Sequence, residues 1–289
     1  MITPIAAPGA DIRDWIGRTE EAADVIVPMR VAELQATLDG AAQSFVLGAE
    51  LPCLHHWMFA AFLGLVPGAD LGPDGHPRRG GFLPPVDLPR RMWAASDVTF
   101  HAPLHIGEAI TRRAEIENVE AKTGRSGALT FVTVRHEYSN SAGLALTDRQ
   151  SIVYREAPDP AERGKVAPGR PAPADGTFSR KLTPDIAMLF RYSALIFNAH
   201  RIHYDLPFAT EVEGYPGLVV HGPLIATLLA DLLHRERPEA RPRRLRFRAM
   251  KPMFEGRPMI VAGRESDDGF VLWAADGDNE LCAEATVTL

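Results

Sequence analysis

Two stretches of the chain combine apolar, strand-like runs with polar turns, and they predict antiparallel hairpins. The first is GALTFVTVRHEYSNSAG, residues 127–143, and the second is GFVLWAADGDNE, residues 269–280. Each is followed by a closing strand pattern, at 148–155 and 281–289. Apolar runs that end in clusters of Gly, Asn, Asp and Ser are typical of β-hairpins. Each half of the chain is therefore expected to contain a run of antiparallel strands.

The same order of elements occurs twice. A Pro-x-x-x-Gly turn precedes each hairpin, PLHIG at Pro103–Gly107 and PMFEG at Pro252–Gly256, with strand-like residues on both sides. The motif alone is weak, but the matched order of elements strengthens it. A repeat of this length is not a solenoid period, so it indicates a duplicated domain.

The expected helices precede the strands. HHWMFAAFLGLVPG, residues 55–68, is apolar nearly all round and predicts a buried helix in the first half. PLIATLLADLLHR, residues 223–235, predicts its equivalent in the second half. Another helix is expected over 186–196, with Thr183 as the N-cap, Pro184 at the first position and Asp185 in the first turn.

The segment APDPAERGKVAPGRPAPADG, residues 157–176, has no hydrophobic period and is rich in Pro, Ala and charge. We interpret it as a linker. It divides the chain into an N-terminal unit, 1–156, and a C-terminal unit, 177–289. Antiparallel sheets wrapped around central helices make an α+β fold.

The composition limits the kinds of partner and compartment that the chain is expected to have. The chain has 289 residues, is 46% hydrophobic and carries a net charge of -6, which argues against nucleic acid. Its two cysteines have no metal or disulfide spacing, so a reducing cytoplasm is expected. No apolar run reaches the roughly 20 residues that span a bilayer, and residues 1–15 lack a secretory signal. The chain should therefore be soluble.

One basic run alternates with apolar residues before the second Pro-x-x-x-Gly turn. It consists of Arg241, Arg243, Arg244, Arg246 and Arg248. The alternation favours a strand with one solvated face. The alternative is that some of these arginines bind the phosphates of a ligand.

The densest polar cluster is FNAHRIHYD, residues 197–205. It places Asn198, His200, Arg201, His203, Tyr204 and Asp205 after an apolar helix. Helix capping accounts for one or two of these residues, but not for six. A second signal is His221-Gly222-Pro223 at the start of the apolar helix, where free N–H groups can stabilise an anion.

Together these residues resemble the MaoC-like, (R)-specific enoyl-CoA hydratase family of hot-dog proteins. NAHRIH, residues 198–203, aligns with the family's D-x-N-P-x-H loop, and His221-Gly222 aligns with its central-helix start. Residues 80–100, GGFLPPVDLPRRMWAASDVTF, resemble mesaconyl-CoA and itaconyl-CoA hydratases and the mitochondrial 3-hydroxyacyl thioester dehydratase. The resemblance covers most of the chain from about Leu54 and implies a double hot-dog, with two sheets merged into one.

The resemblance implies a site and one departure from it. His203 falls on the catalytic histidine, and the Gly222 N–H on the oxyanion hole. Asn198 replaces the catalytic aspartate, and an amide cannot take a proton. The pattern N-x-H-R-I-H-Y-D resembles that of the mesaconyl/itaconyl-type hydratases, so the replacement is expected to mark a subfamily. Asn198 would then orient the attacking water by hydrogen bonds. No cofactor is implied.

The other candidates are substrate contacts. His200 is a second acid/base candidate, and His221 lies at the helix start. Arg201 is a surface residue or a partner for a substrate carboxylate or CoA phosphate. Tyr204 and Tyr215 line the acyl pocket or pack in the core, and Asp205 orients a neighbour or caps the loop.

The expected activity is therefore interconversion of an enoyl-CoA and a 3-hydroxyacyl-CoA, with a short branched or dicarboxylic acyl group such as itaconyl-CoA or mesaconyl-CoA. A hot-dog thioesterase and a non-catalytic acyl-thioester-binding protein are the alternatives, and Asn198 supports the second. A metal site is disfavoured by the spacing of the histidines. The first half is expected to shape the pocket, and the chain to be a monomer or a homodimer.

Overall fold

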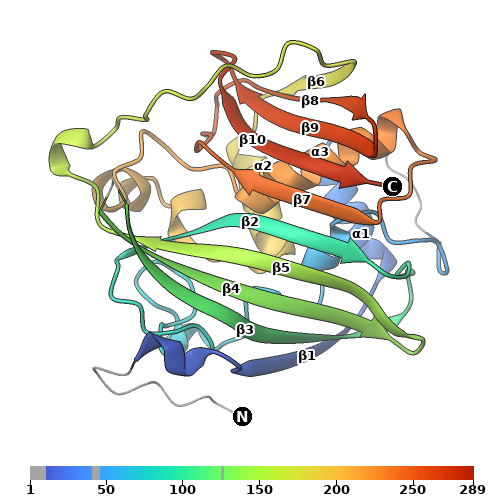
Figure 1. Cartoon of the computed structure of the whole chain (residues 1–289), viewed down its shortest axis with the longest axis horizontal. Helices are drawn as coiled ribbons and strands as arrows, with labels where there is room; N and C mark the ends of the chain where they lie inside the picture. Colours follow the sequence, from blue (N-terminus) through green and yellow to red (C-terminus); the bar gives the residue numbers. More distant parts are fainter. Residues whose placement is uncertain (1–10, 41–45, 125–126) are drawn as a thin grey trace.

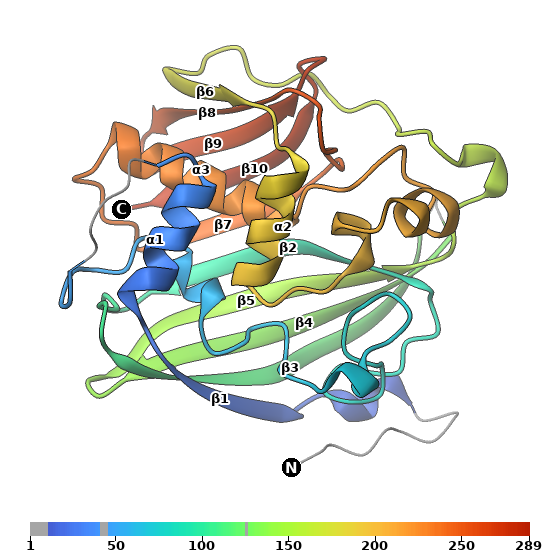
Figure 2. The same ribbon diagram turned by 180° about the vertical axis from the view of Figure 1, so that it is seen from behind.

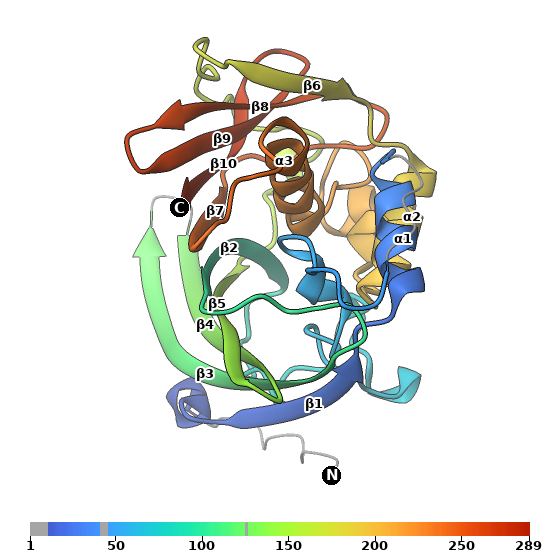
Figure 3. The same ribbon diagram turned by 90° about the vertical axis from the view of Figure 1, so that its right-hand side faces the viewer.

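The computed structural model describes residues 11–40, 46–124 and 127–289. Its centre is a ten-stranded antiparallel sheet that curves around the helices (Figures 1 and 3). The strands of the first half are β1 (Thr19–Val25), β2 (Arg90–Phe100), β3 (Ala109–Gly124), β4 (Gly127–Asn140) and β5 (Gly143–Arg155). Those of the second half are β6 (Phe178–Leu182), β7 (Arg244–Ala249), β8 (Met259–Ser266), β9 (Gly269–Asp276) and β10 (Leu281–Thr288).

The strand order has an internal symmetry. It reads β1-β3-β4-β5-β2 in the first half and, from the far edge inward, β6-β8-β9-β10-β7 in the second. The halves meet where β2 pairs antiparallel with β7, with Ser96 opposite Phe247 and Val98 opposite Leu245. Both predicted hairpin regions are confirmed, as β4–β5 and β9–β10. The duplication inferred from the matched order of elements is therefore present in the fold.

The helices lie together on one side of the sheet (Figure 2). The buried helix predicted over 223–235 is confirmed as α3 (Gly222–Glu236), around which the second-half strands curve (Figure 3). Pro223 occupies its first turn, where a missing N–H costs nothing. Its leucines at 228, 229, 232 and 233 are all at most 3% exposed, as expected for a core helix.

The helix predicted over 186–196 is confirmed as α2 (Ile186–Leu195), but its predicted cap is wrong. Asp185, not Thr183, is the N-cap, and its carboxylate accepts the Met188 N–H at 2.7 Å. The Pro184 carbonyl accepts the Gly256 N–H, which holds Pro184 outside the helix. A carboxylate at this position also complements the helix dipole.

The helix predicted over residues 55–68 is wrong. Only a 3-10 turn, η2 (His55–Met58), forms there, and Ala60 and Ala61 have positive φ angles of 55° and 45°. The buried Arg112 guanidinium donates to the carbonyls of both alanines, at 2.7 and 3.2 Å. These bonds hold the two carbonyls outside any helix. Burial of the segment was nevertheless predicted well, since Trp57, Met58, Phe59 and Phe62 belong to the core.

The first half instead has a strand and a helix that the sequence patterns did not indicate. β1 and α1 (Pro28–Thr37) occupy the places that β6 and α2 occupy in the second half. α1 packs against α2 (Figure 2). Each helix is ten residues long and buries one side, with Leu34 of α1 and Leu189 of α2 in the core, so most of its stability comes from packing rather than from helix propensity.

Between β5 and β6, residues 156–177 form no strand and no α-helix, only the 3-10 turn η4 (Pro160–Glu162). The segment is anchored to the β9–β10 turn, since Ala172 N–H donates to Asn279 and Leu281 N–H donates to Arg170. None of the helices in the described ranges is long and apolar enough to cross a membrane. The signal-sequence expectation rests mainly on residues 1–10, which lie outside the described residues.

Candidate active site

The polar cluster of the sequence lies in the connection between α2 and α3 (Figure 2). After α2, Phe197 has a positive φ of 52°, which turns the chain sharply. Asn198 then fixes the turn, because its side-chain oxygen accepts the His200 N–H at 2.9 Å. The 3-10 turn η5 (Arg201–His203) follows, and it brings His203 back towards α3.

His203 is buried, with 6% of its surface exposed, and its protonation state follows from one contact. Its Nδ1 lies 2.8 Å from the carbonyl oxygen of Val219. A carbonyl can only accept, so Nδ1 carries the proton and Nε2 of the neutral ring is left as a proton acceptor. Burial lowers the pKa of His203 to about 4, which keeps the ring neutral at neutral pH.

The ring of His203 lies over the start of α3. It stacks on His221, with centroids 3.6 Å apart and planes inclined by 21°. His221 is the N-cap residue of α3, and its Nε2 is hydrogen-bonded to Ser193 Oγ of α2 at 2.8 Å. Gly222 follows directly. The site residues expected from two separate motifs are therefore brought together.

Gly222 lies in tight contact with the first half. A Cβ atom on it would lie 2.9 Å from the ring of Trp93 in β2, closer than real Cβ contacts. Only glycine lets the helix start approach this indole. The first N–H groups of a helix lack acceptors inside it, so this end of α3 can stabilise negative charge.

His200 completes a row of imidazoles. Its ring lies 5.4 Å from that of His203, nearly perpendicular to it, and 4.4 Å from that of His76. Burial lowers the pKa of His76, His200 and His221 well below the ordinary value. Two buried nitrogens, His200 Nε2 and His221 Nδ1, have no hydrogen-bond partner among the described residues. Such orphaned polar atoms indicate a place for water or substrate.

His76 belongs to the first half, and the sequence patterns did not identify it. It lies in the turn GPDGHP, residues 72–77, which is docked on the second half. A Cβ atom on Gly75 would lie 1.8 Å from the Ala199 carbonyl oxygen, and Gly75 has a φ of +87°. Arg201 N–H donates to the Asp74 carbonyl at 2.9 Å. The Gly-Pro-Asp-Gly turn signal could have marked this loop, but not its partner.

The turn at residues 72–77 is held in place by a buried ion pair between Asp74 and Arg91. Asp74 accepts two hydrogen bonds from Arg91 of β2, at 2.9 and 3.1 Å. Burial alone would raise the pKa of Asp74, but the guanidinium outweighs it and the pKa is lowered. Removing one partner of such a pair leaves an uncompensated buried charge, so the pair holds the loop firmly.

Arg201 and Asp205 interact with each other. Arg201 Nε and Nη2 lie 2.8 and 2.6 Å from the Asp205 carboxylate, and Nη1 donates to the Pro73 carbonyl. The other carboxylate oxygen of Asp205 accepts the Phe208 N–H at 3.1 Å. Asp205 thus both orients a neighbour and caps the following π-helical turn, η6 (Phe208–Val212), as expected.

The two tyrosines lie apart from the imidazole row. Tyr204 is 47% exposed, and its hydroxyl donates to the Ala199 carbonyl. Tyr215 lies under the Arg90 guanidinium, 4.8 Å from it, and Arg90 is paired with Glu213 at 2.7 Å. Burial raises the pKa of both Glu213 and Tyr215. No group of three or more potential metal ligands occurs among the described residues.

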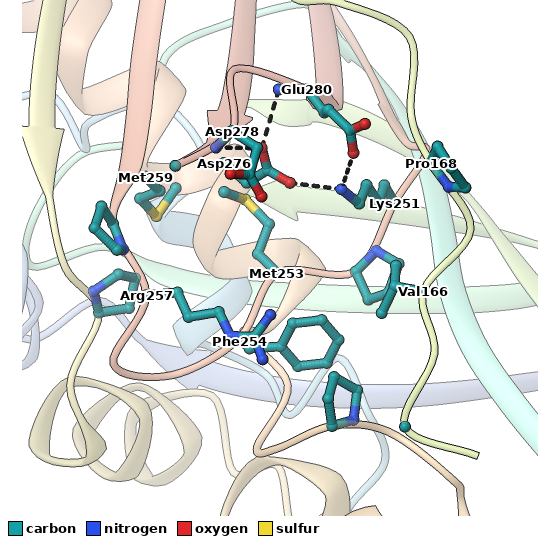
Figure 4. A pocket seen from close by; sticks show the side chains of 16 residues that line it. Val166, Pro168, Lys251, Met253, Phe254, Arg257, Met259, Asp276, Asp278 and Glu280 are labelled. Atoms are coloured by element: carbon teal, nitrogen blue, oxygen red, sulfur yellow. Dashed lines mark hydrogen bonds and ion pairs between the residues drawn. The ribbon is translucent and has the colours of Figure 1, made fainter. Parts of the chain in front are cut away.

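A cavity of about 630 Å³ is lined by Lys251, Met253, Phe254 and Met259 and by the acids of the β9–β10 turn (Figure 4). Val220 N–H donates to the Met253 carbonyl, and Val219 forms a bridge with Phe254. Lys251 in its wall is paired with two carboxylates, and the lining contains two cations and three acids. These are Lys251 and Arg257, and Asp276, Asp278 and Glu280. A net charge of one negative disfavours a polyanion here.

Comparison with known proteins places the chain among characterised relatives. A family model for hydroxyacyl-thioester dehydratase type 2 matches residues 54–255. A protein of Chloroflexus aurantiacus named mesaconyl-C(4)-CoA hydratase is 43% identical over 284 residues, which cover 97% of this chain and 98% of the relative.

Solved structures agree on the fold. A MaoC-like dehydratase from Phytophthora capsici superposes with a TM-score of 0.67 at 15% identity, covering 96% of this chain and 97% of that one. A Mycobacterium tuberculosis protein with a double hotdog fold superposes with a TM-score of 0.54 at 12% identity, covering 94% and 95%. The duplicated ten-stranded sheet is thus a double hot-dog, as the sequence resemblance implied.

Proposed function

Because the chain belongs to the hydroxyacyl-thioester dehydratase type 2 family, we propose that it is a hydro-lyase that interconverts an enoyl-CoA and a 3-hydroxyacyl-CoA. The observation that carries the proposal is the stacking of His203 on His221 at the start of α3. It sets a neutral base beside a helix N-terminus, and this reaction needs both. The family membership supports the reaction class, and the 43% identical relative supports a short dicarboxylic acyl group.

Hydration has three requirements. Water must lose a proton as it attacks the β-carbon, the α-carbon must gain one, and the thioester oxygen must be stabilised as an enolate. With Nδ1 held by the Val219 carbonyl, His203 Nε2 is the group that takes the proton from water. The imidazolium so formed can return a proton to the α-carbon on the same face, as in a syn addition.

The enolate oxygen is assigned to the Gly222 N–H. This donor lies at the positive end of α3. The start of α3 can lie against Trp93 because Gly222 has no Cβ. One donor of this kind lowers the activation barrier by about 2.7–4 kcal/mol. A positioned acid/base contributes roughly 10²–10⁴-fold. Neither is sufficient alone.

Asn198 and His200 are proposed to hold the attacking water. The Asn198 oxygen is already bonded to His200 N–H, so its NH₂ group is left as a donor towards water. The unpartnered Nε2 of His200 is a second contact. The aspartate expected in this family is not needed as a base if His203 performs both proton transfers. His200 remains the second acid/base candidate.

Substrate selection is proposed to involve Arg201, His221 and the tyrosines. All three guanidinium nitrogens of Arg201 have partners, in Asp205 and the Pro73 carbonyl. A carboxylate of mesaconyl-CoA or itaconyl-CoA would therefore have to compete with Asp205. Tyr204 and Tyr215 stay candidates for the acyl pocket, although their contacts resemble packing at least as much.

The second candidate function is non-catalytic binding of acyl thioesters, and Asn198 in place of aspartate favours it. One experiment separates the candidates. The protein is incubated with crotonyl-CoA, mesaconyl-CoA and itaconyl-CoA while enoyl absorbance and free thiol are followed. Loss of the enoyl band without thiol is expected. Thiol release would indicate a thioesterase, and binding without either change would indicate a binding protein.

The two halves of the chain are proposed to have different roles. We divide the chain into a pocket-shaping unit at 1–156, a linker at 157–176 and a catalytic unit at 177–289. The joined β2 and β7 strands already supply the interface that two separate hot-dog chains would make, which favours a monomer or a homodimer of such chains. A cytoplasmic location stays a prediction.

A further inference from the structure

The internal symmetry points to a second binding region. In the second half, the helix start at His221-Gly222 faces Trp93 of the opposite strand, β2. The equivalent place in the first half is η2, which carries His55 and His56 and lies between α1 and β2 as α3 lies between α2 and β7. A cavity of about 710 Å³ occurs there, lined by residues that include His56 and by Leu245 of β7. A cavity thus lies beside the first-half turn that corresponds, in the order of elements, to the start of α3.

We propose that this first-half cavity is a second ligand site, separate from the catalytic one, for an anion that carries an apolar chain. The expected ligand is an acyl group with a carboxylate or a CoA head. The proposal does not depend on the hydration chemistry, and it assigns a role to the first half beyond shaping the catalytic pocket.

The walls of the cavity are apolar. They are built from both halves of the chain and include Leu51, Leu54, Phe100, Leu104, Leu146 and Leu233. Pockets for small ligands are commonly apolar clefts of roughly 300–1,000 Å³ with few polar groups, and this cavity fits that description. An acyl chain laid against these walls would be stabilised by burial of its own surface.

The rim of the cavity is basic. It includes Arg237, Arg241 and Arg243 against one carboxylate, Glu50. Arg237 is paired with Glu265 at 3.1 Å, Arg241 is 3.8 Å from Glu50, and Arg243 has no carboxylate within 4 Å among the described residues. Arg243 is therefore the rim arginine that is left to bind an anion, whereas the cavity near Lys251 has a net charge of one negative. Charge complementarity favours an anion here.

The basic run of the sequence is thereby divided. Arg244 and Arg246 pair with Asp97 of β2, at 2.6 and 3.5 Å, and act as a solvated strand face. Arg241 and Arg243 precede β7 and line the cavity instead. The solvated-face interpretation therefore fits Arg244 and Arg246, and the ligand-binding alternative is proposed for Arg241 and Arg243 alone.

The floor of the cavity contains a buried imidazole. His56 is 1% exposed, and its Nε2 has no hydrogen-bond partner among the described residues. The nearest acid, Asp148, is 3.8 Å away and already accepts hydrogen bonds from Trp57 at 2.8 Å and Gln150 at 2.6 Å. His56 Nε2 therefore lies nearest this buried carboxylate, and the His56 ring forms part of the cavity wall.

The cavity is separated from the catalytic site. Leu233 and Arg237 lie at the C-terminal end of α3, about 20 Å along the helix from Gly222. A pair of indoles lies between His56 and Gly222, with the Trp57 and Trp93 rings 5.5 Å apart and Trp93 against the helix start. His203, His221 and Gly222 do not line the first-half cavity.

The test is a calorimetric titration of the full chain with decanoate, with decanoyl-CoA and with CoA alone. Decanoyl-CoA has no enoyl double bond, so it is a ligand rather than a substrate. Two variants alter the cavity at its exposed rim, Arg243→Glu and Ala102→Trp, where misfolding is not expected. Arg248→Glu is the matched control, since Arg248 is exposed on β7 and does not line the cavity.

We expect decanoate to bind at one site, and both rim variants to weaken this binding by about tenfold or more. Arg248→Glu should leave it unchanged, and all three variants should keep wild-type turnover of crotonyl-CoA. If the pattern appears with decanoyl-CoA only, the ligand is an acyl-CoA rather than a free carboxylate. No saturable binding of either ligand, binding that is unaffected by both variants, or CoA alone binding as well as decanoyl-CoA, overturns the proposal.

Turnover separates this proposal from the proposed function. If a rim variant loses crotonyl-CoA turnover together with binding, the cavity belongs to the catalytic site and the second site is refuted. If the wild-type protein hydrates no enoyl-CoA, the proposed function fails, while the binding pattern of the rim variants still decides whether the cavity is a ligand site.

Discussion

The imidazole of His203 lies face to face with that of His221, with centroids 3.6 Å apart. One residue comes from the loop after α2 and the other is the N-cap of α3. This contact joins the two motifs on which the proposed chemistry depends. It places the general-base candidate over the helix end whose N–H groups would stabilise the enolate.

Gly222→Ala should lower kcat strongly. The added Cβ would lie 2.9 Å from the Trp93 ring, so the start of α3 must shift and its N–H must move with it. We expect a loss of roughly 10²–10³-fold in kcat, as for loss of an oxyanion donor. Gly217→Ala is the matched control, since nothing lies within 4 Å of its Cβ position. Equal kinetics for the two variants would remove Gly222 from the mechanism.

Gly75→Ala should undock the first-half loop from the catalytic one. Its Cβ would collide with the Ala199 carbonyl, and the φ of +87° is itself strained for alanine. Turnover should fall because His76 would leave His200, while circular dichroism should show a retained fold. Gly68→Ala, whose Cβ position is open, should behave as wild type. Unchanged turnover in Gly75→Ala would mean that the docking has no part in catalysis.

The free energy of unfolding should decrease as the pH falls below about 6.5. Burial lowers the pKa of His203 from 6.5 to about 4, so between these values the unfolded chain binds a proton that the folded chain does not. Folding is therefore favoured fully above this window and progressively less within it. Urea unfolding measured across the window checks this. His203→Gln should make the dependence shallower by the contribution of one of several buried histidines, and His234→Ala, which alters an exposed residue, should not.

Arg201→Ala separates two roles of this arginine. A substrate-carboxylate contact predicts a larger loss of kcat/KM for mesaconyl-CoA than for crotonyl-CoA, by a factor of about ten for one charge-assisted contact. A purely structural role, through Asp205 and the Pro73 carbonyl, predicts equal losses for both. Arg201→Lys keeps the charge without the fork and should recover part of any selective loss.

The sequence predicted what depends on local patterns. Hairpins, the helix over 223–235 and the repeat are encoded in residue order, and the loop at 198–203 was identified because its motif is contiguous. The failures have tertiary causes. The helix expected over 55–68 is replaced by an irregular path because the distant Arg112 binds the Ala60 and Ala61 carbonyls.

The contribution of His76 could not be predicted for a similar reason. Its turn is recognisable, but its place beside His200 depends on the Arg91–Asp74 ion pair and on the fit of Gly75 against Ala199. Contacts between segments more than a hundred residues apart leave no periodic signal in a single sequence. The same holds for the orphaned nitrogens of His200 and His221.

The most direct test of the account is turnover by His203→Ala. On whichever of crotonyl-CoA, mesaconyl-CoA or itaconyl-CoA the wild-type protein hydrates, kcat should fall by roughly 10²–10⁴-fold. The circular dichroism spectrum should be unchanged, and His234→Ala should retain full activity. Substantial residual hydration by a folded His203→Ala protein would contradict the assignment of the base and, with it, the proposed mechanism.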